Sequence, residues 1–161
     1  FMMMYRKNEA PLEFDVQKVT EQSKDNPVFY VQYAHARISS VINKLKKTNM
    51  NIDLTNFDNC NFSLLDKEGE IELIKILLDW KSVIETAVNL YEPHRISYYL
   101  YDLSSSFHSL WNQGKIDKNN KFIDEERPEI SNVRIALLIA TQETLKSGLS
   151  LIGVSAPDEM Q

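Results

Sequence analysis

The fold is decided by one stretch, NPVFYVQYAHAR, which occupies residues 26–37 of this 161-residue chain. Asn26 can cap a helix, because its side-chain oxygen can accept a hydrogen bond from a first-turn N–H group. Pro27 suits the first helical position, since proline lacks the N–H group that would have no partner there. The sequence therefore predicts a helix that begins at Pro27 and continues to about Lys47.

The predicted helix has two faces of different character. At about 100° per residue, one face is aliphatic and is expected to be buried; it carries Val28, Val31, Ile38, Ile42 and Leu45. A second face, roughly 120° away, carries Tyr30, Tyr33, Arg37 and Lys44. A helix that buried only an aliphatic face would not need aromatic rings and a guanidinium aligned on another. The second face is therefore the candidate functional surface.

The same stretch resembles the segment that opens the C-terminal helical domain of arginyl-tRNA synthetases, the DALR anticodon-binding domain. Later segments also resemble this family, and they are residues 92–96, 99–103 and 107–108 of the central helix and residues 134–138, 145–149, 151–154 and 156–160 at the chain end. The Asp-Ala-Leu-Arg string itself is absent, and residues 132–135 stand in its place as Asn-Val-Arg-Ile. The resemblance implies an all-α helical bundle that binds the anticodon loop of a tRNA specific for arginine.

The resemblance also implies that Tyr30, Tyr33, Arg37 and Met160 face the anticodon loop, and Trp111 is the nearest candidate for a further aromatic contact. Lys44 joins the predicted site because it shares the helix face of these tyrosines and Arg37. Aromatic rings beside a guanidinium form a platform on which unpaired bases stack, at about 1–3 kcal/mol per base. The alternative for the tyrosines is packing against a neighbouring helix, and Trp111 can equally be a core residue. His35 lies beside the aliphatic face, where a hydrogen-bonded core histidine is the expected role.

The charge of the chain is acidic, at a formal −5, whereas most nucleic-acid binders carry a basic surplus. Recognition of unpaired bases depends on stacking and hydrogen bonding to base edges, so it tolerates this charge, but we expect the chain alone to bind weakly. Lys44, Lys46 and Lys47 lie near the predicted helix end. They either offset the helix dipole there or contact the RNA backbone.

The first residues do not resemble the start of a protein. Residues 1–7, FMMMYRK, begin with an apolar run that suits a buried strand. In the resembled family a similar segment ends the catalytic domain, which implies a short extended remnant over residues 1–14 and the helical domain over residues 15–161. The other interpretation is a short strand native to the domain edge.

Helical spacing and punctuation predict the rest of the chain. The expected segments are a short helix at 15–24, a loop at 49–63, two helices on either side of a break at 79–81, a helix from Pro93 to Gly114, a loop at 114–128 and a last helix at 131–147. Asp66 is expected to cap the first of the paired helices. Gly148 is expected to end the last helix in the left-handed conformation.

Composition and motifs exclude several functions. The three histidines are not at metal-ligand spacing, no glycine-rich phosphate loop is present, and the ATP-binding signatures of class I synthetases are missing. We therefore expect no catalytic residue, metal or cofactor here. The resemblance implies that ATP and magnesium belong to the catalytic domain of the parent enzyme, and that this catalytic domain is a partner of the helical domain. The single cysteine, Cys60, indicates a cytoplasmic protein, and the lack of a long apolar run indicates that no membrane is a partner. The resemblance to a tRNA-binding domain implies that DNA is not a partner.

Two alternatives stay open at this point. The first is a helical protein–protein interaction module in which Tyr30, Tyr33 and Arg37 form the centre of an interface, since tyrosine and arginine are enriched at such centres. The second is a DALR-type domain of a different synthetase.

Overall fold

The computed structural model describes residues 1–6, 21, 25–50 and 52–160, and within these residues it is helical with no strand. The helices are α2 (Pro27–Leu45), α3 (Glu68–Leu78), α4 (Trp80–Asn89), α5 (His94–Ile116) and α6 (Pro128–Leu151), with short 3-10 turns η1 (Phe62–Leu64) and η2 (Lys118–Asn120). The all-α prediction is confirmed. The short helix predicted at 15–24 and the predicted boundary between residues 14 and 15 lie outside the described residues.

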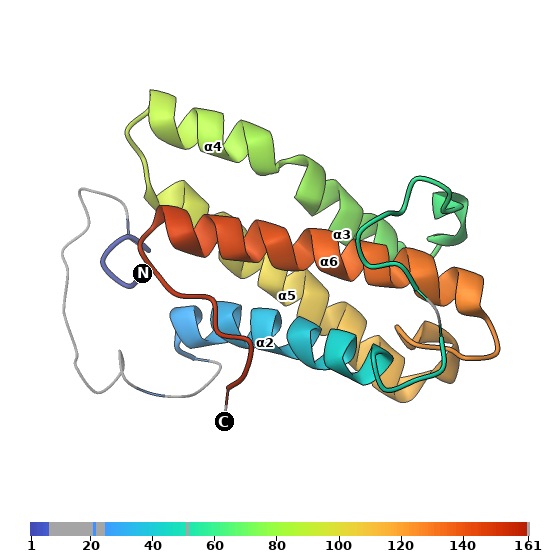
Figure 1. Ribbon diagram of the computed structural model, residues 1–161. Coiled ribbons are helices and arrows are strands. Elements are labelled where there is room, and N and C mark those ends of the chain that lie inside the picture. The colour runs from blue at the N-terminus through green and yellow to red at the C-terminus, as the bar shows by residue number, and fades with distance from the viewer. Residues whose placement is uncertain (7–20, 22–24, 51, 161) are drawn as a thin grey trace.

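Helix α5 is the centre of the bundle, because it packs against α2, α3, α4 and α6 (Figure 1). Its fully buried face is formed by Leu100, Leu103 and Phe107, which recur at helical spacing. Helix α6 crosses the same core and contributes Ile135, Leu138, Leu145 and Leu149. In Figure 1, α2 lies on one side of α5 and the α3–α4 pair lies on the other.

The start of α2 follows the prediction. The Asn26 side chain accepts hydrogen bonds from the N–H groups of Val28 and Phe29, and Pro27 occupies the first turn. Val31, Ile38 and Leu45 of the aliphatic face are buried, while Val28 and Ile42 are half-buried. The helix ends at Leu45, two residues before the predicted end at Lys47.

The prediction for the end of α6 is wrong. Gly148 lies inside the helix and is buried. A Cβ atom at this position would lie 2.5 Å from Leu100 Cδ2 and 3.1 Å from Trp80 Cη2, so there is no room for a side chain. The glycine thus permits close helix packing. The left-handed residue is Gly153, with φ of +71°, and α6 continues to Leu151.

Two further predictions are corrected. The run at the chain start is a turn and not a strand over Phe1–Arg6, and the Met4 N–H group donates to the Phe1 carbonyl at 2.9 Å. Its apolar side chains find partners without a sheet, since Tyr5 packs edge-on against Tyr98 at 5.0 Å between ring centroids. Asp66 does not cap α3; the carboxylate of Glu70 instead accepts from the Lys67 N–H at 3.2 Å.

Residues 152–160 form a tail that carries no helix. From the end of α6 the tail turns back and crosses α2, so the last described residues lie beside the middle of that helix (Figure 1). The tail therefore brings the chain end to the face of α2 that carries Arg37.

Candidate nucleic-acid interface

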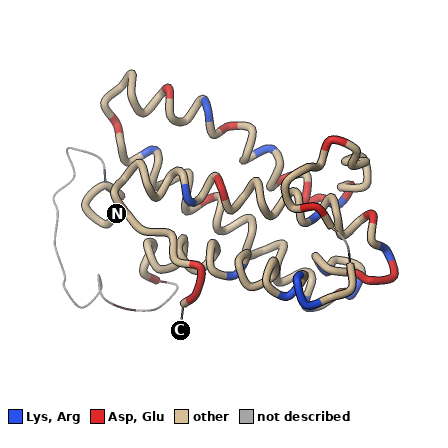
Figure 2. Tube along the Cα trace, in the orientation of Figure 1, with Lys and Arg blue, Asp and Glu red and all other residues tan. Residues whose placement is uncertain are grey.

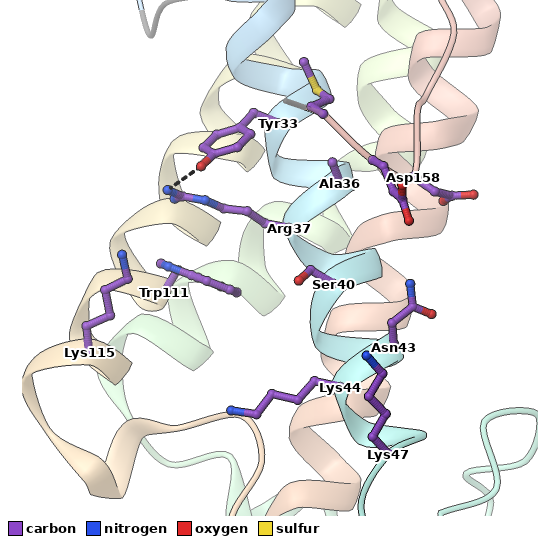
Figure 3. A pocket seen from close by; sticks show the side chains of 12 residues that line it. Tyr33, Ala36, Arg37, Ser40, Asn43, Lys44, Lys47, Trp111, Lys115 and Asp158 are labelled. Atoms are coloured by element: carbon purple, nitrogen blue, oxygen red, sulfur yellow. Dashed lines mark hydrogen bonds between the residues drawn. The ribbon is translucent and has the colours of Figure 1, made fainter.

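An open hollow of about 930 Å³ lies between α2, α5 and the C-terminal tail (Figure 3). We call it the aromatic pocket. It is lined by Tyr33, Ala36, Arg37, Ser40, Asn43, Lys44, Lys47, Trp111, Lys115, Asp158, Glu159 and Met160. Five of the six side chains predicted for the site therefore meet around one hollow, and only Tyr30 does not line it.

Arg37 lies against two aromatic rings at the wall of the aromatic pocket. Its guanidinium carbon lies 4.2 Å from the centroid of the Tyr33 ring and 5.2 Å from that of Trp111. Nη2 donates to the Tyr33 hydroxyl at 3.2 Å, as Figure 3 shows. Contact with two rings holds a guanidinium in position while leaving its charge intact. No described carboxylate lies within 4.0 Å of this guanidinium.

His108 of α5 is the fourth member of this cluster. Arg37 Nη1 donates to His108 Nδ1 at 3.1 Å, and His108 Nε2 donates to the Tyr30 carbonyl at 3.3 Å. Burial and, to a smaller extent, the nearby Arg37 charge lower the pKa of His108 to about 4, although the hydrogen bond to the Tyr30 carbonyl acts in the opposite direction. The imidazole is therefore neutral at physiological pH, and its Nδ1 lone pair is available to the arginine.

Tyr30 stands apart from the aromatic pocket. Its ring packs 5.1 Å from that of Tyr101 and 4.5 Å from that of His108, measured between centroids, and it is half-buried. Tyr33 follows it by three positions, so the two tyrosines share a side of α2 at different heights along the helix. Tyr30 thus packs against His108 of the cluster, and its predicted contact with RNA stays a prediction.

The tail is fastened to α2 by a row of hydrogen bonds. Gln32 Nε2 donates to the Ser155 carbonyl at 2.8 Å, and His35 Nδ1 donates to the Pro157 carbonyl at 2.9 Å. Ser39 Oγ then donates to Asp158 at 2.9 Å. His35 is only 2% exposed, so the predicted role of a hydrogen-bonded core histidine is confirmed. These bonds carry Met160 to the pocket rim, where it is half-buried.

Trp111 is both a wall of the pocket and a neighbour of the core. Its ring packs 6.1 Å from those of Phe107 and Phe122, yet one part of it faces the hollow. Figure 3 shows Arg37 on one side of Trp111 and Lys44 on the other. The two roles left open for Trp111 by the sequence are therefore compatible.

The charge around the pocket differs from that of the whole chain. Four cationic side chains line it, Arg37, Lys44, Lys47 and Lys115, against two carboxylates on the tail. In Figure 2 the basic residues gather at the C-terminal end of α2, and the acidic residues of the tail lie nearer its middle. A local basic surplus exists on a chain whose formal net charge is −5.

Sequence reasoning missed four contributors, which are His108, Lys115, Asp158 and Glu159. Lys115 follows Trp111 by four residues on a helix, a spacing that places both on one face and could have identified it. His108 precedes Trp111 by three residues and has a similar signal, whereas its contact with Arg37 and the positions of Asp158 and Glu159 depend on contacts between distant segments. Over the described residues, no group of three or more His, Cys, Asp or Glu side chains could hold a metal ion, and no helix is both long and apolar enough to span a membrane.

Comparison with known proteins places this geometry in a family. Residues 31–160 match the family described as the DALR anticodon binding domain. The chain belongs to this family, which confirms the resemblance seen in the sequence. The fold agrees with that of the arginyl-tRNA synthetase of Thermus thermophilus, with a TM-score of 0.76 and 26% identity over 99% of this chain and 25% of that one.

Two curated relatives match along nearly the whole of this chain. The arginine–tRNA ligase of Beijerinckia indica is 52% identical over 163 residues, and that of Rickettsia akari is 46% identical over 162 residues. The alignments cover 100% and 99% of this chain respectively. The chain spans 28% of the length of each of these relatives.

Proposed function

We propose that this chain is the part of an arginine–tRNA ligase that binds the anticodon loop of its tRNA. Binding at the aromatic pocket would hold the tRNA so that its acceptor end reaches a catalytic domain elsewhere in the protein. The observation that carries the proposal is Arg37, a guanidinium that contacts two aromatic rings at an open pocket and has no described carboxylate within 4.0 Å. Such a group stacks on a base and attracts the backbone phosphates.

The remaining chemistry of aminoacylation falls outside these 161 residues in this proposal. ATP and magnesium would act in the catalytic domain, as the resemblance to arginyl-tRNA synthetases implies. The cytoplasm is the proposed location, consistent with a single cysteine in the chain. The proposed partner is an arginine-specific tRNA, supported by the names of the relatives.

The direct test is a binding titration at low salt with an RNA hairpin that carries the anticodon loop of an arginine tRNA. A hairpin with the same stem and a short, closed loop serves as the control ligand. We expect the open loop to bind better, and Arg37→Ala to weaken binding by about ten- to a hundredfold. Arg95→Ala is the matched control variant, because Arg95 lies on the same bundle, pairs with Glu92 and does not line the pocket. Equal binding by Arg37→Ala and Arg95→Ala would contradict the proposal.

The full-length enzyme offers a second test. There, Tyr33→Ala or Arg37→Ala is expected to raise the Michaelis constant for tRNA while leaving the ATP-dependent activation of arginine unchanged. Competition with tRNAs for other amino acids tests the proposed specificity. A variant enzyme with an unchanged dependence on tRNA concentration would remove these residues from the binding role.

A further inference from the structure

A second, smaller hollow adjoins the aromatic pocket. Its volume is about 200 Å³, and its lining consists of Val41, Lys44, Trp111, Gly114, Lys115, Lys121, Phe122 and Ile123. Trp111, Lys44 and Lys115 line both hollows, so the two meet along these three side chains. We call the smaller hollow the side slot.

The side slot combines an apolar wall with a cationic rim. Val41, Phe122 and Ile123 form the apolar part, and the Phe122 ring packs 6.1 Å from that of Trp111. Three exposed ammonium groups, those of Lys44, Lys115 and Lys121, surround it. An apolar wall suits the face of a nucleobase and lysines suit a phosphate, so this pairing fits a nucleotide better than an apolar peptide or a lipid chain.

The loop that carries Lys121 is held in position by contacts with α5 and α6. Gly114 permits its close approach to α5, because a Cβ atom there would lie 2.9 Å from the Asn120 carbonyl oxygen. From α6, buried Arg134 donates through Nη1 to the carbonyls of Asn119 and Lys121, each at 2.8 Å. A binding site whose backbone is fixed before the ligand arrives loses less entropy on binding.

We propose that the side slot holds the nucleotide next to the one bound in the aromatic pocket, with Lys121 on its phosphate. In this arrangement Trp111 separates two successive unpaired nucleotides of one RNA loop. The inference rests on the proposed function, since it needs an unpaired RNA segment in the aromatic pocket. It adds a second base position and a phosphate contact from the α5–α6 connection.

The test compares Lys121→Gln with Lys118→Gln in hairpin binding measured across a series of salt concentrations. Both lysines are exposed, lie in the same connection and lose the same charge, but Lys118 lines neither hollow. Lys121→Gln is expected to weaken binding by about three- to tenfold and to lower the slope of log affinity against log salt by about 0.7–1. Lys118→Gln is expected to change both quantities much less.

Hairpins with a single abasic nucleotide, moved one position at a time through the loop, test the base position. Two adjacent abasic positions are expected to weaken binding by the unmodified chain, each by about five- to a hundredfold. One sensitive position alone would overturn the side slot, and so would equal effects of Lys121→Gln and Lys118→Gln. If Arg37→Ala weakens binding while Lys121→Gln does not, the side slot fails and the proposed function stands. Failure of the unmodified chain to distinguish the open from the closed hairpin would refute both.

Discussion

Two arginines of this bundle lie on helices that pack together, yet one is paired with a carboxylate and the other contacts only neutral groups. Arg134 of α6 is 3% exposed at its side chain and donates through Nε to Glu70 of α3 at 2.6 Å, while Nη1 binds two backbone carbonyls. Arg37 of α2 is half-buried, and its partners are a histidine nitrogen, a phenol and two aromatic rings, all of them neutral.

The difference separates a structural charge from one available to a ligand. A buried ion pair recovers the cost of removing its charges from water only when both partners and their hydrogen bonds are present. Arg134 and Glu70 meet this condition, so their charges are compensated within the fold. The charge of Arg37 is positioned but not neutralised, and an anionic ligand can complete its environment. The absence of a carboxylate partner is therefore more informative about Arg37 than its position on α2.

The largest expected effect comes from breaking the compensated pair. Glu70→Gln removes the negative charge and leaves the Arg134 guanidinium buried, which should lower the free energy of unfolding by about 3–5 kcal/mol. Urea denaturation monitored by circular dichroism measures this change. Replacing both partners, as Glu70→Leu with Arg134→Met, is expected to cost less than Glu70→Gln alone, because no isolated charge remains. A double variant less stable than the single one would show that the carbonyl contacts of Arg134 matter more than its charge pairing.

The next effect concerns the neutral partner of Arg37. Because His108 has a pKa of about 4 in the folded chain against an ordinary value of 6.5, the unfolded chain binds a proton first as the pH falls. Above pH 6.5 the contribution of neutral His108 to the free energy of unfolding is fully present. This contribution is lost as the pH falls from 6.5 towards 4. The full loss amounts to about 3 kcal/mol, from roughly 1.4 kcal/mol per pH unit.

His108→Gln provides the control for this titration. The glutamine amide can accept from Arg37 and donate to the Tyr30 carbonyl without titrating, and every other ionisable group stays the same. The difference in unfolding free energy between the two proteins should therefore shift in favour of the variant as the pH falls from about 7 to about 4. A difference that stays constant over this range would mean that His108 takes up its proton at the same pH in the folded and the unfolded chain.

Much of the fold was predictable because periodic apolar positions determine helices directly. The start of α2 and the break between α3 and α4 follow from local chemistry, namely the Asn26–Pro27 pair and the interruption at residues 79–81. Gly148 was mispredicted because a helix-ending glycine and a close-packing glycine look the same in sequence. Only the position of Leu100 from another helix distinguishes them.

The site was predictable on α2 but not across the bundle. Tyr33, Arg37 and Lys44 share a helix face, so their spacing alone places them together. The position of His108 against Arg37 depends on how α5 crosses α2, and the position of Asp158 depends on a tail that turns back over α2. The contrast between Arg37 and Arg134 was equally hidden, because Glu70 lies 64 residues from its partner.

The smallest expected effect on stability belongs to Arg37 itself. Arg37→Met removes a stacked cation and two hydrogen bonds to neutral groups near the surface, and should lower the free energy of unfolding by only about 1 kcal/mol. Arg134→Met, the same replacement, leaves Glu70 buried and unpaired and is expected to cost about 3–5 kcal/mol. Urea denaturation of the two variants side by side compares their losses of unfolding free energy. Arg37→Met should still lose most of its binding to the open hairpin, so stability and RNA affinity respond to different arginines. If Arg37→Met proves as unstable as Arg134→Met, the charge of Arg37 is part of the fold, and its loss of RNA binding would no longer indicate a direct contact.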